Sequence, residues 1–216
     1  MPSRTFPFSN GYFYHIFNRG SEKRSIFETQ RDYQRFLKTL KYYQILGPKP
    51  RFSRFPSPLS NKLDESQKVI EIIAFCLMPN HFHLLLRQNT DRGITEFTSK
   101  LSNSYTKYYN TKHTRVGPLF QGEFKAVLME SDEQLVHVSR YIHLNPVVSG
   151  LVKQPDHYQW SSYREFLDPI KSGVCLKDPI LGFFKNPSDY QQFVLDQIGY
   201  AQELEFIKHQ LLDAEA

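Results

Sequence analysis

The segment LMPNHFHLLLRQ, residues 77–88, places two histidines, His81 and His83, at the start of an otherwise apolar run. Successive side chains of a β-strand point to opposite faces, so the two imidazoles share one face while Phe82 and the leucines two and four positions further on share the other. The Met-Pro-Asn that precedes the histidines is typical of a turn. The pattern therefore predicts a strand over 81–87 that follows a hairpin turn and has one face for packing and one for binding.

The segments around this strand alternate between strand and helix patterns. Strands are indicated by alternating or β-prone apolar residues, and helices by apolar residues three and four positions apart. Strands are expected over 12–19, 68–77, 81–87 and 119–129, and helices over 31–43, 95–110 and about 131–144, the last stopped by Pro146. The order βαββαβα predicts an α+β protein with a ferredoxin-like antiparallel sheet and helices packed on one face.

The chain divides near residue 150. Residues 1–150 contain the whole predicted sheet and form the expected catalytic domain, whereas 151–216 are expected to form a C-terminal helical extension with a helix over about 188–198. Within the first part, residues 48–67 are rich in Pro, Ser and charge, which predicts a mobile insertion loop.

Charge is unevenly distributed along the chain. Residues 1–129 carry 20 Lys and Arg against 9 Asp and Glu, whereas residues 130–216 carry 7 against 13. With 13 Tyr and 18 Phe in the chain, the basic part is typical of a nucleic-acid surface, where cations contact phosphates and rings stack on unpaired bases. Ordinary solvated charge is the alternative interpretation.

Several classes of protein are disfavoured by composition. The sequence has neither a long apolar run nor an apolar stretch near its first residues, so we expect no membrane span and no signal peptide, and an intracellular, cytoplasmic location. Its two cysteines, Cys76 and Cys175, are too few and too far apart for a disulfide framework or a CxxC metal site.

The segment HVSRYIHLNP, residues 137–146, carries the remaining candidates for chemistry. His137, Tyr141 and Asn145 recur every four residues and lie on one face of the predicted helix. Paired imidazoles with an oxygen ligand are able to hold a divalent ion such as Mg or Mn against a phosphate, and a tyrosine phenol can then attack the phosphorus. Each signal alone is weak, because such histidines and tyrosines are more often structural.

The motifs together resemble a known family. PNHFHLLL resembles the His-hydrophobic-His signature of HUH endonucleases, and SYTKYYNTKHTRVGPLFQGEFK followed by RYIHLNPVVSGLV is similar to the single-tyrosine HUH transposases. The branch of REP-associated tyrosine transposases and their transposase-like relatives is the most similar. The resemblance spans about residues 12–166, and the residues after 166 match weakly.

The resemblance implies roles for four residues. His81 and His83 would bind the metal, Tyr141 would be the nucleophile, and Asn145 would complete the metal site. The insertion-sequence branch often carries Gln at this last position, so Asn145 sides with the REP-associated branch. Insertion-sequence relatives are dimers, whereas the REP-associated kind can act as monomers. The resemblance therefore leaves both a monomer and a homodimer open for this chain.

Other residues have weaker assignments. Tyr105 is the rival nucleophile, although it fits the apolar side of its helix and lacks a polar residue one turn later. His137 and His143 are interpreted as solvated, with phosphate contact as the alternative. A path for DNA is expected along a further set of residues: His15, Asn18, Arg19, Lys23, Arg24, Lys112, Arg115 and Lys125.

These features support two readings of function. The first is a metal-dependent, prokaryotic single-stranded DNA endonuclease and strand transferase that cleaves at hairpin-bearing repeats through a 5′-phosphotyrosine and is nucleoid-associated when bound to DNA. The second is a non-catalytic nucleic-acid-binding protein on a ferredoxin-like sheet, with exposed aromatic rings stacking on bases. The pair Tyr141 and Asn145 separates them, because a pure binding protein would not need it.

The charge distribution predicts strongly salt-dependent DNA binding. Each phosphate contact to a single strand releases roughly 0.7 counterions, so the affinity should fall steeply as salt rises. Titrating a labelled hairpin oligonucleotide with a single-stranded flank at several salt concentrations measures this slope. A flat salt response, or a preference for blunt duplex over the hairpin, would contradict it.

Overall fold

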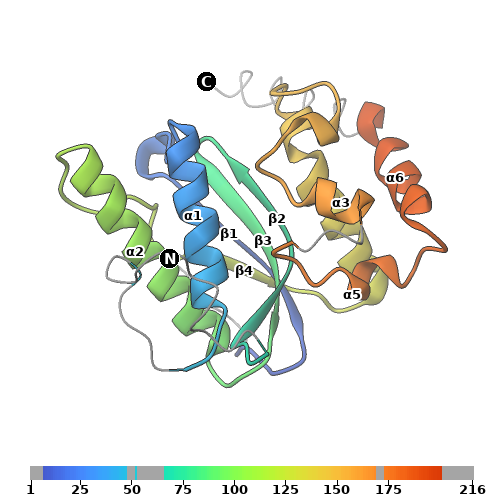
Figure 1. The fold of residues 1–216 in the computed structure, drawn as a ribbon, viewed down its shortest axis with the longest axis horizontal. Coiled ribbons are helices and arrows are strands. Elements are labelled where there is room, and N and C mark those ends of the chain that lie inside the picture. Colours follow the sequence, from blue (N-terminus) through green and yellow to red (C-terminus); the bar gives the residue numbers. More distant parts are fainter. Residues whose placement is uncertain (1–6, 48–51, 53–65, 169–172, 201–216) are drawn as a thin grey trace, which may run out of the picture.

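The computed structural model describes residues 7–47, 52, 66–168 and 173–200, which form a four-stranded antiparallel sheet covered by helices (Figure 1). The strands are β1 (Phe13–Arg19), β2 (Ile70–Met78), β3 (His81–Gln88) and β4 (Lys125–Leu128), in the order β2-β3-β1-β4. Each strand pairs antiparallel with its neighbours. The predicted α+β class and ferredoxin-like order are confirmed.

Two helices cover one face of the sheet. They are α1 (Gln30–Tyr43), which links β1 to β2, and α2 (Gly93–Lys112), which links β3 to β4. The apolar side of β3, with Phe82, Leu84 and Leu86, is buried against them, and Tyr105 of α2 is fully buried there. Burial of this apolar surface is the main term that stabilises the fold.

The opposite face is also covered, which corrects the expectation of helices on one face only. Helix α3 (Asp132–Val148) packs on β2 and β3. Short helices α4 (Tyr163–Leu167), α5 (Asp178–Leu181) and α6 (Pro187–Leu195) follow it, with 3-10 turns η1 (Ser21–Lys23) and η4 (Pro155–His157) elsewhere. Figure 1 shows α3, α5 and α6 on the side of the sheet away from α1 and α2.

Two element boundaries differ from the expectation. Helix α3 continues through Pro146 to Val148, because a proline in the last turn removes only one backbone hydrogen bond and its ring is buried. Strand β4 covers only 125–128 rather than 119–129, since Phe120 forms an isolated bridge with Gly20 and Gly122 takes a positive φ of 67°. The predicted insertion loop, 48–67, lies almost wholly outside the described residues.

The segment after residue 150 shares a core with the sheet. Tyr163, Phe166 and Tyr190 are fully buried in one cluster with Ala74 and Cys76 of β2. The backbone N–H of Leu77 also donates to the carbonyl of Trp160, at 2.9 Å. The described part of the extension is therefore packed on β2 and α3, while a domain boundary at 150 stays a prediction.

His143 lies at the centre of this second core, which corrects its interpretation as a solvated histidine. It is fully buried, its Nδ1 lies 2.7 Å from the Tyr190 hydroxyl, and its Nε2 lies 2.8 Å from the Ser162 hydroxyl. Ser162 in turn accepts from the backbone N–H of Phe75 at 2.9 Å. This chain of hydrogen bonds joins α6, α3 and β2, and it satisfies polar groups that would otherwise be costly to bury.

Burial lowers the pKa of His143 to about 3.

No helix in the described part of the chain is long and apolar enough to cross a membrane.

We predict that His143 makes the fold sensitive to acid. Its folded pKa lies below the ordinary 6.5, so its contribution to stability is complete above pH 6.5 and is lost as the pH falls toward 3. This residue accounts for about 2 kcal/mol of the loss in unfolding free energy between about pH 7 and pH 5. Urea denaturation at the two pH values measures it.

The variant for this test is His143→Phe, with exposed His157→Phe as the control. His143→Phe should be less stable at neutral pH, because it removes one hydrogen-bond partner from each of the Ser162 and Tyr190 hydroxyls, but it should lose less stability on acidification. Other buried histidines also contribute to the pH dependence of the unfolding free energy, so part of that dependence should remain in the variant. An unchanged pH dependence in His143→Phe would show that His143 is not the group responsible.

Candidate metal and tyrosine site

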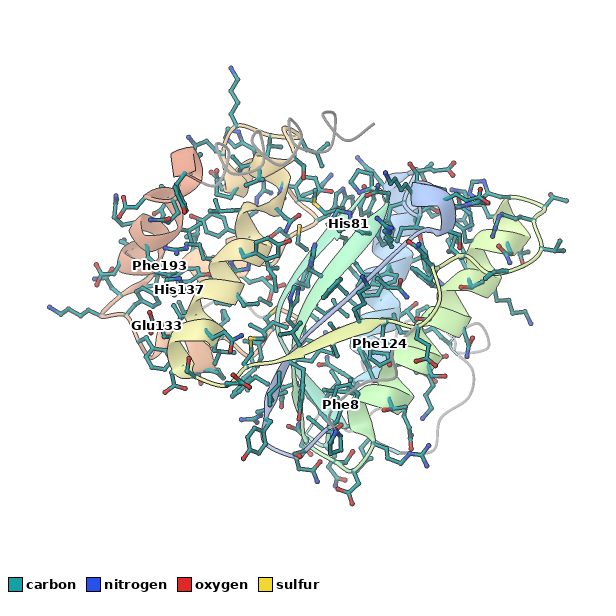
Figure 2. The ribbon with its side chains drawn as sticks, turned by 180° about the vertical axis from the view of Figure 1, so that it is seen from behind. Phe8, His81, Phe124, Glu133, His137 and Phe193 are labelled. Carbon is teal, nitrogen blue, oxygen red and sulfur yellow. The ribbon has the colours of Figure 1, made fainter. Side chains whose placement is uncertain are left out.

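The two histidines of β3 lie together on the face of the sheet that α3 covers. The ring centroids of His81 and His83 are 4.9 Å apart and the rings are perpendicular. His83 is buried and His81 is partly exposed at the end of its strand. Figure 2 shows His81 at the opposite end of the sheet from Phe8. Alternation along β3 produces this arrangement, because the one residue between them, Phe82, points into the other core.

Each of these histidines has one ring nitrogen engaged by a neighbour. Nδ1 of His81 lies 2.7 Å from Oδ1 of Asn80, and Nδ1 of His83 lies 2.9 Å from Nε2 of His15. A histidine that binds a metal through Nε2 usually donates its Nδ1 proton to such a partner. Nδ1 of each of the two rings has a neighbour of this kind, Asn80 for His81 and His15 for His83.

Helix α3 brings its candidates to the same place. The ring centroid of Tyr141 lies 5.5 Å from that of His83 and 6.0 Å from that of His15, both edge-on. Asn145, one turn further, is 8% exposed, and its Nδ2 donates to the Tyr141 carbonyl at 3.5 Å. Its side chain is close enough to His81 to raise the pKa of that imidazole, against the burial that lowers it. Tyr141 is 51% exposed, so about half of this residue is open to solvent. The structure thus gathers the four residues that the sequence proposed.

All three histidines of this cluster have lowered pKa values. Burial lowers the pKa of His15 to about 4. Burial also lowers the pKa of His81, partly offset by its hydrogen bond with Asn145. The pKa of His83 is held well below its usual range by burial first and then by the neighbouring His15 and His81. Neutral imidazoles are the form that binds a metal.

The donor set suits a weakly held divalent ion. Two imidazole nitrogens and one amide oxygen supply three positions, which leaves the others of an octahedral ion for water and phosphate oxygens. Among the described residues, no three His, Cys, Asp or Glu side chains gather into a metal site. Asn145 is the oxygen donor that the sequence suggested beside the two histidines.

Several residues expected along a DNA path surround the end of β1. The Asn18 side chain is bonded to the backbone at Gly122 and Arg19, and the Arg19 guanidinium bonds Gln121. Arg24 donates to the Ser21 carbonyl at 3.0 Å. Lys23 and Lys125 are exposed near the same edge. DNA contact by this group stays a prediction.

Two other residues expected along the DNA path, Lys112 and Arg115, make polar contacts within the protein, and their contact with DNA stays a prediction. The Lys112 ammonium lies 2.8 and 2.9 Å from the two carboxylate oxygens of fully buried Asp32. Burial raises the pKa of Asp32, but hydrogen bonds from the Lys112 ammonium, the Thr29 backbone N–H and the Tyr108 hydroxyl outweigh it and lower this pKa to about 2. Arg115 donates to Asn110 and to the Pro118 carbonyl, which holds the loop after α2.

The rival tyrosine lies elsewhere. Tyr105 is fully buried and donates to the carbonyl of Ile26 at 2.5 Å, on the face of the sheet away from the histidines. Burial raises its pKa far above the ordinary value. His137 is exposed on α3, where its Nδ1 lies 3.0 Å from the Arg140 guanidinium and its ring contacts Phe193 (Figure 2).

Sequence reasoning missed the contacts of His15 and Asn80 with the histidine pair. The sequence does indicate which residue shares a face with His15. This histidine stands two positions before Phe17 on an alternating strand, so both side chains lie on the same face. The register that brings it to His83 is not readable from one strand alone.

Comparison with known proteins places this geometry in a family. The profile described as transposase IS200-like matches residues 9–145, which include both histidines, Tyr141 and Asn145. The chain belongs to the IS200-like transposase family. The matched part ends at Asn145, so the family likeness covers the sheet and the site but stops before the extension.

Two similar proteins extend the comparison. A protein of Haemophilus influenzae assigned as a REP-associated tyrosine transposase is 29% identical over 104 residues, which cover 44% of this chain and 59% of that protein. A solved structure of a REP-associated tyrosine transposase bound to a REP hairpin has a TM-score of 0.54 and 17% identity, covering 81% of this chain and 89% of that one. The second likeness confirms the fold.

We predict that His81 and His83 are both needed to bind a divalent ion. Replacing either with Ala removes a nitrogen ligand, so the affinity for Mn²⁺ should fall at least about tenfold. Metal affinity falls by this much even when only a hydrogen-bond partner of a ligand is removed. Isothermal titration with Mn²⁺ in the absence of DNA measures it, with His157→Ala as the control. Wild-type Mn²⁺ affinity in the double variant would refute the site.

Proposed function

We propose that this transposase-family chain is a metal-dependent single-stranded DNA endonuclease and strand transferase that acts at hairpin-bearing repeats. The observation that supports it most is the approach of Tyr141 and Asn145 from α3 to His81 and His83 from β3. The solved relative bound to a REP hairpin supports the class of DNA. Because the match to the Haemophilus protein covers 59% of its length, activity and substrate are proposals here.

The reaction we propose is an in-line displacement at a phosphodiester. The Tyr141 hydroxyl oxygen forms a bond to phosphorus, and the bond from phosphorus to the 3′ oxygen breaks with its electron pair going to that oxygen. The exposed phenol gives its proton to water, and the leaving oxygen takes one to become a 3′-OH. The products are a 5′-phosphotyrosine and a free 3′ end.

The chain's residues serve this reaction in distinct ways. A divalent ion, Mg or Mn, held by His81, His83 and Asn145 would neutralise the nonbridging oxygens, whose charge otherwise repels the attacking oxygen. Tyr141, four residues before Asn145 on the same helix, stays aligned with that phosphate because both side chains are fixed on one rigid element. The phosphotyrosine keeps the bond energy, so another 3′-OH can attack it and join the strands.

We predict that Tyr141→Phe abolishes the covalent adduct and leaves binding intact. The exposed ring keeps its contacts with the histidines, so fold and Mn²⁺ affinity should be unchanged, while adduct formation should fall by at least about 10³-fold, as when a nucleophile is removed. A labelled hairpin oligonucleotide incubated with Mn²⁺ and resolved on a denaturing gel shows the adduct directly.

The matched control is Tyr12→Phe, because Tyr12 is 55% exposed and belongs to neither the histidine cluster nor α3. Mass spectrometry of the wild-type adduct should identify the peptide that contains Tyr141. An adduct that survives in Tyr141→Phe, or DNA attached at Tyr105, would refute the assignment. Hairpin binding without any cleavage in the wild type would favour a binding protein instead.

A further inference from the structure

His15 of β1 makes the closest polar contact to the buried histidine of the site. Its Nε2 lies 2.9 Å from Nδ1 of His83, and the two rings are nearly stacked, with centroids 5.1 Å apart and planes at 25°. Both side chains are buried, at 8% and 6% exposed. In the sheet register His83 stands opposite Phe17, so His15 is its diagonal neighbour on the same face.

A single proton in this contact determines which nitrogen of His83 is available. A neutral imidazole has one N–H and one lone pair, on different nitrogens. If His83 donates from Nδ1, its Nε2 carries the lone pair and can bind an ion. If His15 donates from Nε2 instead, Nδ1 of His83 accepts and its Nε2 carries the proton, which blocks a metal there.

We propose that His15 is a positioning residue: its Nε2 accepts the Nδ1 proton of His83 and thereby keeps the Nε2 lone pair of His83 free for the divalent ion. The inference rests on the proposed metal-dependent function and adds to it. Asn80 makes the equivalent contact with His81, because its Oδ1 lies 2.7 Å from Nδ1 of that ring. Both histidines of the strand are then held in the same tautomer by different neighbours.

This role differs from the DNA contact that the sequence suggested for His15. A phosphate needs an accessible donor, whereas His15 is buried and its Nε2 is engaged by Nδ1 of His83, as an acceptor in the proposed tautomer. Its ring also meets Tyr141 edge-on, with centroids 6.0 Å apart. In the proposal, His15 therefore packs against Tyr141 and acts on the ion only through His83.

Nitrogen NMR on the metal-free protein tests the tautomer directly. Ring ¹⁵N chemical shifts distinguish a protonated from an unprotonated nitrogen, and the wild type should show His83 protonated at Nδ1 and His15 unprotonated at Nε2. The reverse assignment would overturn the proposal. This readout needs no variant and no activity.

Two substitutions at His15 test the consequence for metal binding. His15→Phe keeps a ring but removes the acceptor, so Mn²⁺ affinity should fall about 10- to 100-fold, the usual loss when a partner of a metal ligand is removed. His15→Gln offers its Oε1 near the position of Nε2, so it should recover most of that loss. His157→Phe, at an exposed histidine, should bind Mn²⁺ as the wild type does.

The outcomes separate this proposal from the function on which it rests. Wild-type Mn²⁺ affinity in His15→Phe, or equal losses in His15→Phe and His15→Gln, would overturn the role of His15 and leave the metal site standing. Failure of the wild type to bind Mn²⁺ would overturn the proposed function itself. If His15→Phe does not fold, the NMR measurement on the wild type still decides the question.

Discussion

The antiparallel pairing of β1 with β3 is the constraint on which the site depends. It sets which side chains share a face, because a slip of one residue in either strand would turn every side chain of that strand over. In the observed register, His15, His81 and His83 all face α3, while Tyr14, Phe82 and Leu84 face the core under α1 and α2. One register therefore provides both the apolar core and the cluster of histidines.

Helix α3 must also hold one rotation about its axis for the site to form. Residues facing the histidines, Tyr141 and Asn145, alternate along this helix with residues that face the second core, among them Ile142 and His143. The hydrogen bonds of His143 to Tyr190 and Ser162 fasten that opposite side to α6 and to the segment before α4. The extension thus supports the helix that carries the nucleophile candidate, although the family match ends at Asn145.

Burial of imidazoles in a basic chain gives the site its electrostatic character. Burial lowers the pKa values of His15, His81 and His83 and so favours their neutral forms, which offer lone pairs. Cationic side chains near the end of β1, such as Lys23 and Lys125, remain exposed. Lys112, by contrast, is neutralised by Asp32 and belongs to the packing of α2 on α1. A count of charges along the sequence does not distinguish an exposed lysine from one that forms an ion pair within the protein.

The sequence by itself determined the elements and the main candidates. Alternation in 81–87 placed His81 and His83 on one face, and the four-residue spacing placed Tyr141 with Asn145, because both regularities follow from local backbone geometry. Only the tertiary structure decided what those faces meet. Contacts between distant segments, such as His15 with His83 and His143 with Tyr190, depend on strand register and helix rotation, which one strand or helix pattern does not specify. For the same reason, the packing of α3 on the second face of the sheet and the ion pair between Lys112 and Asp32 are evident only in the tertiary structure.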